Sequence, residues 1–192
     1  MAPAHSVRGA DFNGQSASDD ARRLAGWVAR TGDAAGMDFL IVDKKNASLL
    51  VFDADARLKG SSPVLIGAAV GDDTVPGIGS REIADVRPEE RTTPAGRFVG
   101  QRGHDTKGED MIWVDYDAGV SIHRVVTSNP AERRLERLAT PAVEDKRISY
   151  GCINLPVAFY EQYVQPVFAN RRAVVYVLPE IKPLEQVFAL AG

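Results

Sequence analysis

Apolar and polar positions along the chain predict a mainly β protein. Short runs rich in β-branched and aromatic residues are separated by polar turns, a pattern typical of strands. We expect strands over 39–43, 49–53, 63–70, 97–101, 111–116, 119–126 and 173–178. The polar segment 44–48 joins the first two runs, which predicts a β-hairpin there.

Helical spacing of apolar residues is confined to a few segments. We expect helices over 19–31, 130–139 and 156–169. Ser18 can cap the first helix, which ends before Gly32, and Asn129 can cap the second. The third helix has an apolar stripe suited to a core-facing side, made of Phe159, Tyr160, Tyr163, Val164 and Val167. The predicted fold class is therefore α+β, mainly β with peripheral helices.

Two segments lack any periodicity. Residues 1–17 are rich in Gly, Ser and Ala, so we expect a poorly ordered terminus. Residues 71–92 are rich in Gly, Asp, Pro and charge, which predicts a long surface loop with one helical turn near Glu82. Loops of this length often border functional sites.

Composition and charge narrow the possible partners. With 192 residues, 44% hydrophobic and 26% charged, the chain is long enough for one well-buried core. A net charge of −3 gives no overall field for nucleic acid or anionic lipid, so neither is an expected partner. No apolar run approaches the roughly 20 residues of a membrane span, and no export signal is present in this chain, as would also hold after a signal had been removed. One cysteine excludes an intramolecular disulfide and a Cys-rich metal cage.

The single cysteine, Cys152, is a candidate nucleophile. It lies in the segment 149–154, which reads Ser-Tyr-Gly-Cys-Ile-Asn. A thiol becomes nucleophilic when a base or positive charge stabilises its thiolate, and acyl transfer also needs backbone N–H groups directed at the developing oxyanion. Gly151 allows a tight turn in which the N–H groups of Gly151 and Cys152 form an anion-binding corner. The alternative is that Cys152 is a small buried residue, a common role for a lone cysteine.

His123 is the best-placed candidate base. His5 falls in the terminal segment and His104 in a polar loop, whereas His123 lies in a predicted strand. Because strand side chains alternate, Ser121, His123 and Val125 share one face. Such a strand can hold the imidazole rigidly against a neighbouring loop. The alternative is a strand histidine whose ring is satisfied by the backbone, but a Cys and a His each supply what the other needs for catalysis.

At these residues the sequence resembles the YkuD-type L,D-transpeptidase catalytic domain. The resemblance rests on 149–154, on Ile122-His123, and on 91–98, which reads Arg-Thr-Thr-Pro-Ala-Gly-Arg-Phe. The segments 39–44, 49–53, 63–64 and Gly67 also look like the first strands of that domain. The resemblance implies a mixed β-sandwich or barrel. It also implies a helical insertion between the strand that carries His123 and the loop that carries Cys152. The chain then divides into an N-terminal segment 1–17, an N-terminal helix region 18–36, a catalytic domain 37–180 and a C-terminal tail 181–192.

The resemblance implies acyl transfer on peptidoglycan stem peptides. Cys152 would attack the carbonyl of the third residue of a tetrapeptide, release the terminal D-alanine and form a thioester that a second amine resolves. His123 would be the general base. Such enzymes need no metal or organic cofactor, act in the periplasm or at the cell wall, and react with carbapenem-type inhibitors.

Further roles follow from the same resemblance. The N–H groups of Gly151 and Cys152, with that of Tyr150, would hold the oxyanion. Ser149 would position the substrate or the loop, and Asn154 would brace the loop.

One departure from the family pattern lies beside the nucleophile. Tyr150 stands where the usual motif has a second His. Tyrosine can donate a hydrogen bond but is no base near neutral pH, since its reference pKa is about 10. Any role of that second His in substrate binding is therefore changed or lost, and Tyr150 is either an aromatic wall of the loop or a proton-transfer group.

A second departure is the spacing of the two candidate residues. His123 and Cys152 are 29 positions apart, and the surplus is the charged segment 129–146. This insertion is either a lid that selects the substrate or a solvated excursion. Arg124, which follows the His, either favours the thiolate, binds a substrate carboxylate or faces solvent.

Three functions stay open at this point. The favoured one is an L,D-transpeptidase that forms cross-links or attaches proteins to the cell wall. A carboxypeptidase or amidase would let water resolve the same thioester. A non-catalytic wall-binding domain is the third, and the presence of both Cys152 and His123 argues against it.

Overall fold

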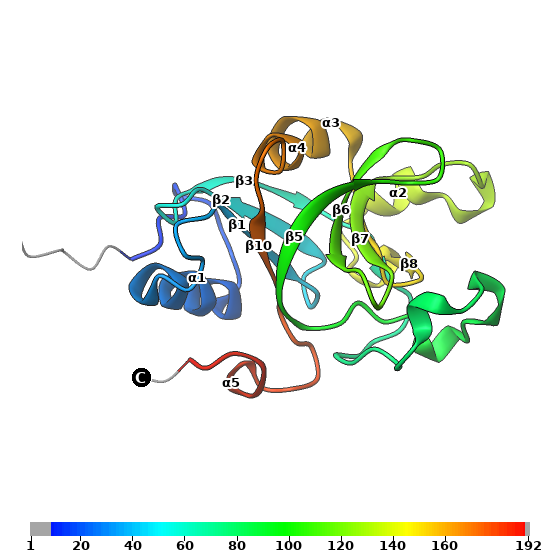
Figure 1. The fold of residues 1–192 in the computed structure, drawn as a ribbon, viewed down its shortest axis with the longest axis horizontal. Helices are drawn as coiled ribbons and strands as arrows, with labels where there is room; N and C mark the ends of the chain where they lie inside the picture. Colours follow the sequence, from blue (N-terminus) through cyan, green and yellow to red (C-terminus); the bar gives the residue numbers. More distant parts are fainter. Residues whose placement is uncertain (1–8, 191–192) are drawn as a thin grey trace, which may run out of the picture.

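A computed structural model describes residues 9–190 of the chain, so part of the predicted terminus 1–17, including His5, and residues 191–192 lie outside the described residues. The fold is a nearly closed mixed β-sheet with a few short helices around it, which confirms the predicted class (Figure 1). The eight strands run in the order β3-β2-β1-β10-β5-β6-β7-β9, and β4 pairs with β8 in a second, two-stranded sheet.

The strand bounds agree with most of the predicted runs. The strands are β1 (Phe39–Asp43), β2 (Ser48–Phe52), β3 (Leu58–Pro63), β4 (Ile66–Gly67), β5 (Gly96–His104), β6 (Asp110–Asp115), β7 (Val120–Arg124), β8 (Arg147–Ser149), β9 (Ile153–Leu155) and β10 (Ala173–Val177). The pairs β1·β10 and β7·β9 of the main sheet are parallel, and its other pairs are antiparallel. The parallel pairing of β7 with β9 places the His strand beside the strand that follows Cys152.

The helices are short and lie outside the sheet. They are α1 (Asp19–Thr31), α2 (Arg134–Ala139), α3 (Val157–Phe159), a π-helical turn (Tyr160–Val164), α4 (Gln165–Val167) and α5 (Leu184–Val187). Single 3-10 turns occur at Ile78–Ser80, Ile83–Asp85, Pro88–Glu90, Pro130–Glu132 and Glu144–Lys146. In Figure 1, α3 and α4 lie at the top of the sheet, α1 lies to the left, α5 lies at the bottom, and α2 lies at the right.

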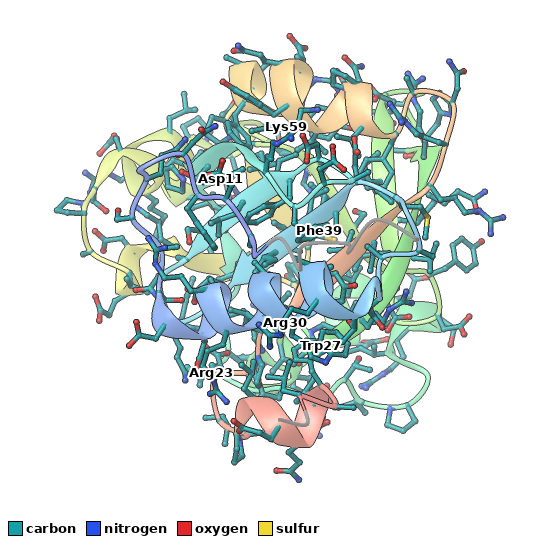
Figure 2. The ribbon with its side chains drawn as sticks, turned by 90° about the vertical axis from the view of Figure 1, so that its left-hand side faces the viewer. Asp11, Arg23, Trp27, Arg30, Phe39 and Lys59 are labelled. Atoms are coloured by element: carbon teal, nitrogen blue, oxygen red, sulfur yellow. The ribbon has the colours of Figure 1, made fainter. Side chains whose placement is uncertain are left out.

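Helix α1 forms where the sequence predicts it because both ends carry local signals. Ser18 Oγ accepts a hydrogen bond from the Ala21 N–H at 3.1 Å, and Gly32 ends the helix with φ 69°. Figure 2 shows α1 in front of the sheet near Phe39, with Arg23 on the side toward α5. Arg23 forms an ion pair with Glu185 of α5, so the end of the chain is tied to the first helix.

Two hydrophobic cores lie on opposite faces of the sheet. Along β1, Phe39 and Ile41 face α1 and α5, whereas Leu40 and Val42 face the core under α3 and α4. Strand β10 divides its side chains in the same way, with Tyr176 on the α1 side. The helices thus cover both faces of the sheet at β1 and β10.

The N-terminal segment departs from the prediction. Residues 9–17, expected to be poorly ordered, pack on the sheet: Phe12 is buried against Phe52, and the Asp11 N–H donates to the Ala56 carbonyl at 2.9 Å. The predicted C-terminal tail likewise contains α5, whose Leu184 is buried. Apolar residues that are isolated in sequence find partners here that no periodic pattern reveals.

The strand predicted over 63–70 is also wrong. Strand β3 instead ends at Pro63, and only Ile66–Gly67 is extended beyond it. Its buried face carries Gly60, which packs against the Tyr163 ring, so the strand has a small residue where a sequence pattern looks for a large apolar one. The adjacent apolar side chains Val64, Leu65 and Ile66 are buried.

The two later helices exist but are irregular. The segment 130–139 is a 3-10 turn and then α2, separated by Arg133 with φ 50°. The segment 156–169 is helical from Val157 to Val167, with the π-helical turn in its middle. Its predicted apolar stripe packs on the core, with Tyr160 and Val164 fully buried.

Candidate active site

Cys152 lies in the turn between β8 and β9 and is partly exposed. Its Sγ is 3.4 Å from Ser121 Oγ and 3.5 Å from the Gly119 carbonyl oxygen. Ser121 belongs to β7, where Ile122 pairs with Ile153. The parallel pairing therefore sets the thiol against Ser121, which lies on the same face of β7 as His123.

The imidazole of His123 is oriented by the backbone. His123 Nδ1 is 2.7 Å from the Arg124 carbonyl oxygen. Since a carbonyl oxygen only accepts, Nδ1 carries the proton and Nε2 remains as the nitrogen that can act as a base. This fixes the tautomer that general-base catalysis by Nε2 requires.

The thiol and the imidazole shift each other's pKa. Burial alone raises the pKa of the Cys152 thiol, but the hydrogen-bonding and charge interaction with His123 outweighs burial, so the pKa is lowered. Burial likewise lowers the pKa of His123, and the interaction with Cys152 reverses this, so that pKa is raised. Both shifts favour a thiolate beside an imidazolium, the charge state of an activated cysteine nucleophile.

The turn before Cys152 is held in place by Thr92, the last residue of the loop 71–92, and by Thr93, which follows it. Gly151 has φ 131°, and a Cβ there would lie 2.7 Å from the Thr92 carbonyl oxygen, so only glycine fits. Thr93 Oγ1 donates to the Gly151 carbonyl at 2.8 Å and accepts from the Gly67 N–H at 2.9 Å. The segments 91–98 and 149–154, which the sequence analysis identified separately, are thus in direct contact in the fold.

A buried ion cluster supports Thr93 from below. The ammonium of Lys44, fully buried, donates to the Thr93 carbonyl at 2.8 Å and to Asp72 at 2.9 Å. Burial raises the pKa of Asp72, but N–H donors of 180–182 and Lys44 outweigh it and lower the pKa to about 2. Since a lowered carboxyl pKa stabilises the fold only while the group is ionised, this support weakens as pH falls toward 2.

Ser149 and Asn154 shape the loop from within. Ser149 Oγ donates to the Cys152 carbonyl at 2.6 Å and accepts from the Gly151 N–H at 3.1 Å. Asn154 is fully buried, and its Nδ2 is 3.4 Å from the Cys152 carbonyl oxygen. In this structure the Gly151 N–H is therefore occupied by Ser149, which corrects the expected use of that N–H for an oxyanion.

Tyr150 stands at the wall of a cavity that Cys152 also lines. The Tyr150 side chain is 41% exposed, and the Arg91 guanidinium lies 4.2 Å from its ring centroid. The cavity has a volume of about 250 Å³, and the loop 71–92 supplies much of its lining, including Ile78 and Arg81. The loop 71–92 therefore borders the cavity beside Cys152, where the sequence led us to expect it near a site.

A second cavity lies on the His123 side. Its volume is about 210 Å³, and Ser121, His123 and Arg124 line it together with Asp105, Glu109 and Asp110. Ser121 contacts the thiol and also lines this cavity, so the thiol and the imidazole each border a cavity. One cavity thus lies on the Cys152 side of the candidate site, and the other lies on the His123 side.

Arg124 does not lie against the thiol. Its guanidinium binds Asp110 at 2.9 Å and Glu161 at 3.0 Å and lies 4.6 Å from the Tyr160 ring centroid. These contacts join β7 to β6 and to the helical segment above. Arg124 therefore anchors the strand that carries His123 rather than facing bulk solvent.

The insertion 129–146 is fastened to the Cys loop. Arg134 of α2 donates to Asn154 Oδ1 at 2.7 Å and binds Glu132 at 2.5 Å, and its charge acts to lower the pKa of His123. At the other end of α2, the buried Lys146 ammonium binds the Leu138 carbonyl. Figure 1 shows α2 on one side of the β6–β7 end of the sheet and the loop 71–92 on the other.

Two residues of this arrangement were missed at the sequence level. Ser121 was recognised only as sharing a face with His123, and its i, i+2 spacing was the available signal. Arg134 had no signal, because its contact with Asn154 joins segments 20 positions apart. Within residues 9–190, no cluster of three or more His, Cys, Asp or Glu side chains could hold a metal ion, and no helix is long and apolar enough to cross a membrane.

Comparisons with known proteins place the fold. No protein-family model matches the sequence, and the search among curated proteins returned no match. The structure is similar to that of the helical cell shape determining protein Pgp2 from Campylobacter jejuni, with a TM-score of 0.51 and 17% identity, over 81% of this chain and 55% of that chain. A K307A mutant of Pgp2 matches over 86% of this chain and 58% of that chain, at 16% identity and the same TM-score of 0.51.

The catalytic domain of the Enterococcus faecium L,D-transpeptidase is also similar, at 18% identity and a TM-score of 0.43, over 74% of this chain and 98% of that domain. The chain spans less than two thirds of the length of Pgp2. At these identities the likeness to Pgp2 establishes the fold, and the chemistry has to be argued from the site.

Proposed function

We propose that this chain is a cysteine acyltransferase of the L,D-transpeptidase type that acts on peptidoglycan stem peptides. The observation that carries the proposal is the Cys152–His123 pair, in which the thiol pKa is lowered and the imidazole pKa is raised, with one cavity beside Cys152 and another beside His123. The sequence resemblance described above supplies the substrate class.

In the first step the Cys152 thiolate attacks the carbonyl carbon of the third residue of a tetrapeptide. A C–S bond forms, and the peptide bond to the terminal D-alanine breaks. The imidazolium of His123 gives its proton to the leaving amine, so D-alanine departs as a neutral amine and the acyl group remains as a thioester.

In the second step an acceptor amine attacks the thioester carbonyl. His123 Nε2 takes the proton from this amine, a new amide forms, and the Cys152 sulfur leaves as a thiolate. Because Gly151 donates its N–H to Ser149, we assign the oxyanion in both steps to the N–H groups of Tyr150 and Cys152.

Two cavities favour transfer over hydrolysis. A donor peptide on the Cys152 side leaves the cavity beside His123 for a second substrate. Two carboxylates on that side, from Asp105 and Glu109, suit the approach of a cationic amine, which loses its proton before it attacks. If water instead resolves the thioester, the same residues give a carboxypeptidase or an amidase.

The proposed place of action is the periplasm or the cell wall. Stem peptides occur there, and the fold match is to a protein whose name describes the determination of cell shape. A role in wall biogenesis and cell shape fits this proposal.

A carbapenem tests the nucleophile. Intact-protein mass spectrometry should show one covalent adduct on the wild type and none on Cys152→Ala, since the chain has a single cysteine. Iodoacetamide serves as the control that the thiol is accessible. Alkylation by iodoacetamide without any adduct from a carbapenem or another penem would contradict the enzyme proposal and favour a non-catalytic wall-binding domain.

Products distinguish transfer from hydrolysis. Incubation with tetrapeptide muropeptides should give cross-linked dimers and free D-alanine from the wild type, and neither from Cys152→Ala. Tripeptides without dimers would assign hydrolysis instead.

A further inference from the structure

A hollow of about 690 Å³ crosses the outer face of β5 and β6, beside the site just described. Its lining includes Gln101 of β5, Trp113 of β6 and Tyr116 in the turn after β6. This volume is within the range of small-ligand sites, which run from about 300 to 1,000 Å³. The proposed acyl transfer leaves this surface unused.

Two aromatic rings form a corner in this hollow. The Trp113 and Tyr116 ring centroids are 5.0 Å apart at an interplanar angle of 71°. A Cβ at Gly103 would lie 2.6 Å from Trp113 Nε1, so the indole packs directly on the strand backbone and is held in place. Tyr116 is 74% exposed, a large exposure for an aromatic ring that packs against another.

The two guanidinium groups around the rings are paired, whereas the carboxylates of Asp115, the last residue of β6, and Asp117, in the turn after it, are hydrogen-bond acceptors at the rim. Arg97 binds Asp33 at 2.7 Å, and Arg102 lies 3.6 Å from Asp110. Asp115 accepts a hydrogen bond from the Ala118 N–H at 3.2 Å. A rim of carboxylate acceptors, paired guanidinium groups and the Gln101 amide suits a ligand that has hydroxyl or amide groups on its edge and an apolar face for the rings.

The hollow lies on strands close to the thiol. Gln101 pairs with Trp113, and Trp113 pairs with Ser121, whose hydroxyl is 3.4 Å from Cys152 Sγ. Neighbouring strands lie about 4.8 Å apart, so β5 is about 10 Å from β7. Three extended residues of a peptide also span about 10 Å.

We propose that this hollow binds an N-acetylated amino-sugar ring of the glycan strand from which the stem peptide hangs, with the ring on Trp113 and Tyr116. The inference rests on the proposed function, because it takes the third residue of the peptide to be the one that reaches Cys152. The sugar ring supplies the apolar face and the neutral polar edge, and the three intervening residues cover the distance to the thiol.

A binding measurement tests this without requiring activity. In Trp27→Phe the chain keeps one tryptophan, Trp113, whose fluorescence reports on the hollow. Titration with an N-acetylglucosamine oligomer should change this fluorescence saturably, and adding Tyr116→Ala should weaken the apparent affinity about tenfold. Tyr116→Phe keeps the ring and should bind like the parent, as should Leu135→Ala, an exposed residue of the insertion.

A second measurement compares two substrates. The wild type should use a disaccharide-linked tetrapeptide with a kcat/KM several-fold above that of the free tetrapeptide, and Tyr116→Ala should reduce this preference. The absence of any fluorescence response to the oligomer would overturn the sugar subsite even if a carbapenem acylates Cys152. An equal response to the free tetrapeptide would overturn it in favour of peptide binding. A saturable response to the sugar without any acylation would leave the subsite standing and remove the proposed acyl transfer.

Discussion

The two halves of the eight-stranded sheet bury their side chains in different ways. Strands β1, β2 and β10 are buried on both faces, one against α1 and α5 and the other against the core under α3 and α4. Strands β5, β6 and β7 bury one face, through Ile112, Val114 and Ile122, and leave Gln101, Trp113 and His123 on the other. The sheet is continuous, yet its strands β2, β1 and β10 have no open face, whereas β5, β6 and β7 and the edge strand β3 each expose one.

This difference explains where chemistry can reside. A strand with two buried faces has apolar side chains at nearly every position, because an unpaired polar group there would cost free energy. A strand with one open face can alternate apolar and polar residues, as β7 does with Val120, Ser121, Ile122 and His123. The first half therefore supplies stability, and the second half supplies both stability and a reactive surface.

The largest effect on folding should come from the doubly covered half. Leu40→Ala removes a side chain with no exposure from the core under α3 and α4 and should lower the free energy of unfolding by about 3 kcal/mol. Val99→Ala on the open face, where the side chain is 44% exposed, should change it by about 0.5 kcal/mol or less. Urea denaturation measures both, and equal losses would contradict the proposed division of the sheet.

The sequence predicts an element well where the element depends on interactions between residues close together in the chain. The hairpin β1–β2 and helix α1 depend on local signals, such as Ser18 and Gly32, and were predicted nearly to the residue. Strand β3 was misplaced because its buried Gly60 is explained only by the ring of Tyr163, about 100 positions away. Local patterns identify strands, whereas tertiary contacts decide where some of them end.

The candidate site likewise has some features that the sequence predicts and others that depend on tertiary contacts. Cys152 and His123 were predicted because their residue types carry chemistry and because the surrounding segments resemble a family. The occupation of the Gly151 N–H by Ser149 could not be predicted, since it depends on the conformation of the turn. The anchoring of Arg124 by Asp110 and Glu161 depends on which elements pack together, and neither alternation nor spacing contains that information.

His123→Ala should have a smaller effect on folding and should mainly change the reactivity of Cys152 on the open face. The side chain is partly exposed, so the free energy of unfolding should change little. Without the imidazole, burial is left to raise the pKa of Cys152, so the thiolate fraction at a given pH falls. Iodoacetamide alkylation at pH 7 should slow severalfold or more, because the thiolate fraction falls as the thiol pKa rises. The midpoint of the pH–rate profile should move to higher pH, and an unchanged profile would contradict the Cys–His pair.

The smallest effect should separate the insertion from the rest of the open face. Arg134→Ala removes the donor to Asn154 Oδ1 and should lower the free energy of unfolding by about 1 kcal/mol. It also removes a positive charge that lowers the pKa of His123, so that pKa should rise further, as an NMR titration of the imidazole would measure. Arg133→Ala is the matched control, because this neighbouring side chain is 69% exposed and pairs with Glu136 instead. If both variants left the His123 titration unchanged, the insertion would be a solvated excursion. A shift in the Arg134 variant alone would make it a part of the site, fastened to the Cys loop through one guanidinium.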